Sequence, residues 1–233
     1  MKYKAIIFDL YGTLVPIFSR KVYDPVLVKM ANILNVPYQE FWKIKTETIN
    51  DRSLGFHSAE DHIKDLGLRL NVSVNKIQIE EILAISNKFT RNSLIPDPEV
   101  LQALNQLKSK GFFLGLITNC NKSVPMEYPN SPLAKYIDIP VFSCEEHIKK
   151  PSTLIYEIAC DRLNIKPKEC VYVGDGSSKE LTGAYAVGML PILKRTDLSD
   201  AYDPHRSDVE NWYGTTIDEI SQLSNMLPDF VVP

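Results

Sequence analysis

The most constraining stretch of the sequence joins a short apolar run to a polar turn near the N-terminus. Ala5, Ile6 and Ile7 are typical of a strand that is buried on both faces of a parallel sheet. Asp9 follows at the carboxyl end of this strand, and Gly12 permits a tight turn directly after it. Because ligands of open α/β sheets bind beyond the carboxyl ends of the strands, the sequence predicts a chemical role for Asp9.

The composition limits the partners that the chain can have. Its 26 lysines and arginines against 29 acidic residues give a formal net charge of -3, which argues against binding to nucleic acid or to an anionic membrane. No apolar stretch approaches the ~20 residues that a membrane-spanning helix needs. The four cysteines lack paired C-x-x-C spacing, so we expect reduced thiols rather than a zinc site. These features predict a cytoplasmic protein with a small-molecule substrate, and they carry no signal for an oligomeric state.

Strand and helix signals alternate from Pro98 onward. Apolar runs predict strands over 112–117, 141–143, 171–173 and 189–193. Apolar residues at helical spacing predict helices over 98–110, 152–163, 181–185 and 217–226. Strands separated by such helices form right-handed crossovers, so we expect an α/β fold with a doubly wound, Rossmann-like parallel sheet. The Pro-rich stretch 123–138 is expected to be irregular, and the polar stretch 196–212 to be a surface connection.

Residues 15–92 show helical periodicity without a strong strand signal. Apolar stripes predict helices near 26–34, 63–70 and 75–87. Because this block interrupts the α/β alternation, we interpret residues 15–92 as an inserted helical cap domain and residues 1–14 and 93–233 as the core. An insertion beside the ligand-binding edge of a sheet is expected to act as a lid.

Polar residues follow the predicted strands at four places. Because parallel strands end at one edge of their sheet, these residues should meet there despite their separation in sequence. They are Asp9, Thr118, Asn119, Lys150, Asp175 and Glu180. A carboxylate nucleophile with a hydroxyl, a lysine and further acids suits phosphoryl transfer through an aspartyl intermediate. Magnesium prefers carboxylate and phosphate oxygens, and it would relieve the repulsion between neighbouring carboxylates.

Four short motifs follow one another along the chain. They are FDLYGTL from residue 8, LITN from residue 116, KKP from residue 149 and VGDGSSKELTGA from residue 173. In order and spacing they resemble the four motifs of the haloacid dehalogenase (HAD) superfamily of hydrolases. The resemblance covers the whole chain, with residues 15–92 in the place of the helical cap of subfamily I. It implies a hydrolase with an aspartate nucleophile.

The resemblance implies a catalytic role for each matching residue. Asp9 would be the nucleophile. Thr118, together with the Asn119 amide, would bind the transferring phosphoryl group. Lys150 would neutralise charge on the nucleophile and the phosphate, and it is preferred to Lys149 because it directly precedes the proline of its motif.

The resemblance also implies a magnesium site. Asp175 would hold Mg²⁺ together with the Asp9 carboxylate and the backbone carbonyl of Tyr11. Glu180 would bind the metal or orient it through water. Mg²⁺ is therefore the cofactor that we expect.

Tyr11 departs from the phosphatases of this family, which usually carry a second aspartate there as general acid and base. The dehalogenases of the family carry tyrosine at this position and grip the substrate with a cap arginine, for which Arg20 is the nearest candidate. Those enzymes lack a pair like Gly174 and Asp175 and work without metal. We therefore predict a magnesium-dependent phosphatase for a small phosphomonoester, with a 2-haloacid dehalogenase and a non-catalytic metal- and phosphate-binding regulatory protein as alternatives.

Tyr11 also has a predicted kinetic consequence. A phenol with a pKa near ~10 is a poor general acid and base at neutral pH. We therefore expect slow hydrolysis of ordinary alkyl phosphates and faster hydrolysis of esters with good leaving groups. His57 and His62 in the cap are alternative proton donors, although both also suit surface or packing positions.

Overall fold

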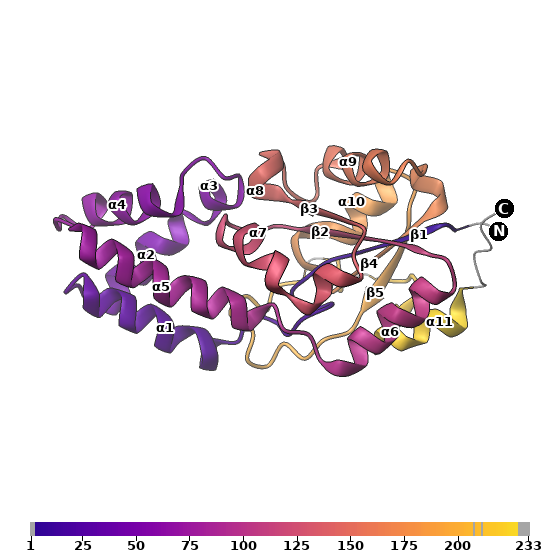
Figure 1. Cartoon of the computed structure of the whole chain (residues 1–233), viewed down its shortest axis with the longest axis horizontal. Helices are drawn as coiled ribbons and strands as arrows, with labels where there is room; N and C mark the ends of the chain where they lie inside the picture. Colours follow the sequence, from indigo (N-terminus) through magenta and orange to yellow (C-terminus); the bar gives the residue numbers. More distant parts are fainter. Residues whose placement is uncertain (1–2, 207, 211, 228–233) are drawn as a thin grey trace.

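The computed structural model describes residues 3–206, 208–210 and 212–227, and it is built around one parallel sheet. The described strands run in the order β3-β2-β1-β4-β5-β6, and every neighbouring pair is parallel (Figure 1). They are β1 (Ala5–Phe8), β2 (Phe113–Thr118), β3 (Ile139–Phe142), β4 (Cys170–Gly174), β5 (Leu190–Lys194) and β6 (Thr216–Ile217). From β1 the chain continues to β2 and β3 on one side of β1, and then crosses to β4 on its other side, so the strand order reverses at β1. Such a reversal is where α/β sheets bind ligands. The predicted α/β fold is confirmed.

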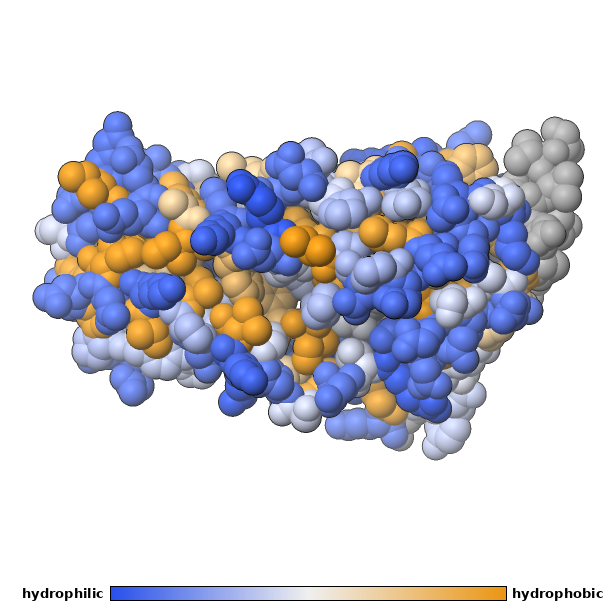
Figure 2. Space-filling model, turned by 60° about the horizontal axis from the view of Figure 1, so that its bottom comes forward, coloured by the Kyte–Doolittle hydropathy of each residue, from blue (hydrophilic) through white to orange (hydrophobic). Residues whose placement is uncertain are grey.

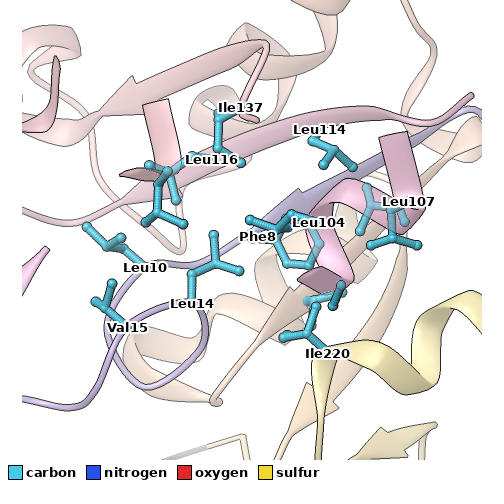
Figure 3. Packing of buried hydrophobic residues seen from close by; sticks show 14 of the residues in the cluster. Phe8, Leu10, Leu14, Val15, Leu104, Leu107, Leu114, Leu116, Ile137 and Ile220 are labelled. Atoms are coloured by element: carbon cyan, nitrogen blue, oxygen red, sulfur yellow. The ribbon is translucent and has the colours of Figure 1, made fainter. Parts of the chain in front are cut away.

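Helices cover both faces of this sheet. Successive residues of each strand point to opposite sides, so both faces of the sheet carry apolar side chains that need to be buried. Phe8 and Leu114 lie on one side, and Figure 3 shows Leu104 and Leu107 packing around Phe8. Ile7 lies on the other side, in a second buried cluster. Helices α6 (Pro98–Ser109) and α11 (Leu223–Met226) cover the first face, and α9 (Thr153–Leu163) and α10 (Glu180–Ala186) the second.

Five helices between β1 and α6 form a bundle of their own, which we call the helical unit and which lies at the left of Figure 1. They are α1 (Arg20–Ile33), α2 (Tyr38–Glu47), α3 (Ile49–Ser53), α4 (Ala59–Arg69) and α5 (Lys76–Ser93). The apolar faces of α1, α2, α4 and α5 share a separate buried cluster that includes Leu27, Phe41 and Leu66. The domain limits at residues 15 and 92 stay a prediction, and α2 and α3 lie outside the helices that the periodicity predicts.

The end of the chain differs from the predicted helix over 217–226. Thr216–Ile217 forms β6 instead, and the Arg195 amide donates to the Ile217 carbonyl at 2.8 Å. A 3-10 turn (Ile220–Gln222) then leads into the short α11. Pairing with β6 satisfies backbone N–H and C=O groups of β5 that a helix over these residues would leave without hydrogen bonds. The pairing between strands therefore outweighs the helical periodicity of the sequence.

The segment 123–138 is also more regular than predicted. It contains α7 (Ser123–Glu127) and two 3-10 turns (Tyr128–Asn130 and Pro132–Lys135), and the helix α8 (Ser143–Glu146) follows β3. The four cysteines are free and buried, as the sequence predicts for reduced thiols. In the described part of the chain, no helix is long and apolar enough to cross a membrane.

Candidate active site

The turn after β1 brings two aspartates together. Asp9 is buried at the end of β1, and Asp175 is buried directly after the neighbouring β4. Gly12 has a φ of +82°, and a Cβ at this position would overlap the Asp175 carboxylate. Glycine is therefore needed both for the turn and for the close approach of the Asp175 side chain.

Lys150 lies at the centre of the site and is only 2 % exposed. Its Nζ is 2.5 Å from Asp9 Oδ1 and 2.5 Å from Glu180 Oε2, and it donates to the Tyr172 hydroxyl at 3.2 Å. Burial disfavours a lone ammonium, but the Asp9 and Glu180 carboxylates outweigh it and raise the pKa of Lys150. The lysine therefore stays charged beside the proposed nucleophile.

Glu180, the first residue of α10, is fully buried and held by several donors. Its Oε2 accepts the Tyr172 hydroxyl at 2.8 Å in addition to Lys150, and its Oε1 accepts the Gly176 amide at 3.0 Å. Burial and the nearby Asp9 carboxylate raise the pKa of Glu180. These contacts make Glu180 a residue that positions Lys150. Nothing in the sequence identifies Tyr172 as part of the site, because its position within an apolar run is typical of any residue in a buried strand.

The carboxylates can hold a cation. One oxygen each of Asp9, Asp175 and Glu180 lie within 4.8 Å of one another. All of these donors are hard carboxylate oxygens, the kind that Mg²⁺ prefers, so the residues present fit the predicted metal. Burial and the Asp175 charge also raise the pKa of Asp9, against the effect of Lys150. A divalent cation between Asp9 and Asp175 would remove this repulsion.

Asp175 already has one cationic neighbour in the protein. Its Oδ1 accepts the Ser177 amide at 3.0 Å, and its Oδ2 accepts the Arg206 Nε at 2.9 Å. Arg206 comes from the segment that the sequence predicts to be a surface connection. Asp208 in the same segment accepts the Leu181 amide at 2.7 Å, which ties the segment to the first turn of α10. Neither residue can be predicted as part of the site from the sequence, since a polar stretch without periodicity gives no sign of what it contacts.

Thr118 and Asn119 follow β2 beside this cluster. Thr118 is buried and faces the cavity described below. The Asn119 side chain is engaged with the backbone of Lys150, since its Oδ1 accepts the Lys150 amide at 2.9 Å and its Nδ2 donates to the Lys150 carbonyl at 3.2 Å. The predicted binding of a phosphoryl group by the Asn119 amide stays a prediction, and the observed contacts make Asn119 a residue that positions Lys150.

The Tyr11 hydroxyl contacts the helical unit, and Tyr11 lines the cavity together with Asp9. Its hydroxyl is 3.2 Å from Ser93 Oγ, and Ser93 donates its own proton to the Thr90 carbonyl at 2.8 Å, so Tyr11 is the donor of this pair. Its ring lies 4.3 Å from that of Phe18. Burial raises the pKa of the Tyr11 phenol, which makes it a poorer acid still than free tyrosine.

A cavity of about 320 Å³ opens over these residues, between the sheet and the helical unit. The space-filling view shows the surface hollowed between the two parts, with apolar side chains beside the hollow (Figure 2). The sheet contributes Asp9, Thr118 and Lys150, whereas the helical unit contributes Lys45 and Arg52. Polar residues from the strand ends and polar groups from the helices thus line one cavity, which has the size of a small-molecule site.

Three predicted contributors from the helical unit lie elsewhere. Arg20 is not among the described residues that line this cavity, and its Nε donates to the Ala201 carbonyl at 3.3 Å. His57 is exposed and also stands outside the lining. His62 is buried, and burial lowers its pKa to about 2, so it is a neutral imidazole near neutral pH and not an imidazolium acid. The structure therefore gives no support to these residues as a substrate clamp or as proton donors.

Comparison with known proteins identifies the family. Residues 3–188 match the family of haloacid dehalogenase-like hydrolases, and the chain belongs to this family. It is 33% identical over 214 residues to a glyceraldehyde 3-phosphate phosphatase of Methanopyrus kandleri, covering 88% of this chain and 89% of that one. It is also 26% identical over 192 residues to (S)-2-haloacid dehalogenase 4A of Burkholderia cepacia, covering 79% of this chain and 80% of that one.

A solved structure shares the fold. The HAD family enzyme of Bacteroides thetaiotaomicron, crystallised with magnesium and inorganic phosphate, matches with a TM-score of 0.66. The match covers 86% of this chain and all of that one, at 18% sequence identity. The protein is therefore an HAD-superfamily hydrolase, as its four motifs predict.

Proposed function

We propose that this hydrolase is a magnesium-dependent phosphatase that acts on a small phosphomonoester with Asp9 as its nucleophile. The observation that carries the proposal is the buried array in which Lys150 contacts Asp9 and Glu180, each at 2.5 Å, beside Asp175. Phosphoryl transfer requires a positioned nucleophile and positive charge around the phosphate, and this array offers both. The phosphatase relative and the structural neighbour with bound magnesium and phosphate support the same substrate class.

Each residue has a defined part in this reaction. The Asp9 carboxylate attacks phosphorus, and the bond to the leaving oxygen breaks with its electron pair on that oxygen. Lys150 stabilises the negative charge that spreads over Asp9 and the phosphoryl oxygens, and Thr118 hydrogen-bonds one of these oxygens. Water then hydrolyses the aspartyl phosphate and restores Asp9. Mg²⁺, held by Asp9, Asp175 and the Tyr11 carbonyl, would supply further positive charge against the phosphate.

The site lacks an effective general acid to protonate the leaving oxygen at the position of Tyr11. The Tyr11 hydroxyl donates to Ser93, and its raised pKa opposes proton transfer at neutral pH. General acid catalysis contributes roughly 10²–10⁴-fold where it operates. The enzyme should therefore favour esters whose leaving group needs no proton.

We further propose that the helical unit acts as the cap over the site, and that the protein works in the cytoplasm.

The first experiment compares p-nitrophenyl phosphate with an alkyl phosphate, each with Mg²⁺ and with excess EDTA. We expect Mg²⁺-dependent phosphate release from both esters and a kcat/KM for the nitrophenyl ester that is higher by about 10²-fold. Equal rates for the two esters would show that another group supplies the proton. No release from either ester would contradict the phosphatase function.

A dehalogenase is the second candidate, because Tyr11 occupies the dehalogenase-like position and Arg206 compensates the Asp175 charge without a metal. Chloride release from 2-chloropropionate, measured with EDTA present, tests it directly. Chloride release without phosphate release would favour the dehalogenase. If neither product forms, a non-catalytic metal- and phosphate-binding protein remains.

Arg206 should compete with the metal. Its guanidinium occupies Asp175 Oδ2, so removing it should ease cation binding at this carboxylate. For Arg206→Ala we expect a Mg²⁺ dissociation constant that is lower by about fivefold, as follows from ~1 kcal/mol for one hydrogen bond. Titration calorimetry measures this constant without reference to turnover. Arg195→Ala is the matched control, because Arg195 forms an exposed ion pair with Asp218. Weaker Mg²⁺ binding in Arg206→Ala would contradict the competition.

A further inference from the structure

Two basic residues of the helical unit line the cavity whose sheet side includes Asp9. Lys45 lies in the last turn of α2, and Arg52 lies in the neighbouring α3. Both side chains are partly buried, and both also line a smaller cavity behind the first. The lining also includes apolar side chains, among them Phe18 and Ile49.

These cations lack acidic partners. Among the described residues, neither side chain has a carboxylate oxygen within 4.0 Å, whereas Lys150 has two. Arg52 Nε is buried and has no hydrogen-bond partner in the described part of the chain. A buried charge without a partner is unfavourable, so such groups are usually paired or bind a ligand.

The charge of Arg52 also disfavours the charged form of Lys45. Burial, together with the Arg52 charge, lowers the pKa of Lys45 well below its usual value, and burial lowers that of Arg52. A structural role explains the position of Arg52 but not that of Lys45. The Arg52 guanidinium donates through one nitrogen to the Lys45 carbonyl at 3.0 Å, which helps to end α2. Lys45 has no comparable role, and an anion between the two side chains would favour the charged form of both.

We propose that Lys45 and Arg52 bind a second anionic group of the substrate, so that the enzyme selects phosphomonoesters that carry a further carboxylate or phosphate. This inference rests on the proposed phosphatase function and extends it. Asp9 and Lys150 take the phosphoryl group that is transferred, and the cation pair takes the other end. A cavity of about 320 Å³ suits a short substrate that reaches both ends.

The test uses substrates that differ in the second group. Glycerol 3-phosphate has a neutral hydroxymethyl group where 3-phosphoglycerate has a carboxylate, and 1,3-propanediol bisphosphate has a second phosphate. We expect kcat/KM to be at least about tenfold higher for one or both doubly anionic esters than for glycerol 3-phosphate, since a charge-assisted hydrogen bond supports such a ratio. The preferred ester shows whether the group is a carboxylate or a phosphate.

Variants then assign this preference to the cation pair. Lys45→Met should reduce the preference by about tenfold or more, mainly through KM, and Arg52→Gln should reduce it as well. Lys43→Met is the matched control, because Lys43 is an exposed lysine on the same helix and lies outside the cavity lining. Its preference should equal that of the native enzyme. The thermal midpoint of Lys45→Met should be equal or higher, because the change removes an unpaired cation.

The possible failures are distinguishable. Absence of Mg²⁺-dependent release from p-nitrophenyl phosphate as well as from all three esters would contradict the phosphatase function. Turnover of the nitrophenyl ester with no preference for doubly anionic esters would overturn only the second-anion subsite. A preference that persists in a folded Lys45→Met enzyme would also overturn it.

Discussion

Asp9→Asn is expected to abolish phosphate release, with a loss of order 10³-fold or more, because it removes the nucleophile and leaves its neighbours in place. Its stability should not fall. Burial raises the pKa of Asp9, so its ionised form destabilises the folded state as the pH rises above the ordinary aspartate range. The asparagine variant lacks this destabilisation, and its amide oxygen can still accept a hydrogen bond from Lys150. We expect its thermal midpoint at pH 7 to equal or exceed that of the native protein.

The stability difference between Asp9→Asn and the native protein should depend on pH in a defined direction. The stability difference between Asp9→Asn and the native protein should shrink as the pH falls towards 4, since protonated aspartate and asparagine are then similarly neutral. Thermal melts at several pH values, beside the p-nitrophenyl phosphate assay, measure both effects. Full activity in a correctly folded Asp9→Asn protein would exclude Asp9 as the nucleophile. A lower midpoint at pH 7 would show that the carboxylate is a net stabilising group.

Lys150→Met should lower both activity and stability. The change leaves Asp9 and Glu180 buried without their shared cation, and breaking such a pair costs about 3–5 kcal/mol. For a chain of this size the corresponding fall in thermal midpoint is on the order of 10 °C. Activity should fall by about 10²–10³-fold, as when one donor to a developing negative charge is removed. Urea unfolding and steady-state kinetics measure the two losses.

The adjacent lysine provides the control for this variant. Lys149 Nζ donates to Asn50 Oδ1 at the surface, and Lys149→Met should leave activity close to native. Loss of Lys150 should also raise the pKa of both carboxylates further, so the stability deficit should narrow as the pH falls from 7 towards 5. A deficit that stays constant over this range would mean that lost packing, rather than unpaired charge, destabilises the variant.

The parts of the fold and site that sequence predicts are those that follow from the sheet. A parallel sheet fixes where its strands end, so apolar runs followed by Asp9, Thr118 and Asp175 predict a common edge. The structure brings these residues together around Lys150, and the motifs identify the same positions. β6 escapes prediction because its two residues become a strand only through pairing with β5.

The parts that sequence does not predict depend on how separate elements pack. Lys45 and Arg52 lie on short helices, and nothing in their spacing shows which way they face. Arg206 lies in an aperiodic polar segment that reaches Asp175 through a tertiary contact. Arg20 was the nearest arginine in sequence, yet its side chain turns to the Ala201 carbonyl, so proximity along the chain was a poor guide.

The central position of β1 has a consequence for how the protein is made. β1 leaves the ribosome well before its partners β2 and β4, which begin only at Phe113 and Cys170. The buried residues of the helical unit's cluster all lie between Leu27 and Ile82, so this unit can form while synthesis continues, since domains generally fold as units during synthesis. The sheet, and with it the contact between Asp9 and Lys150, must wait for most of the chain. A nascent chain halted before β4 would therefore carry a formed helical bundle beside an apolar strand that still lacks one of its neighbours.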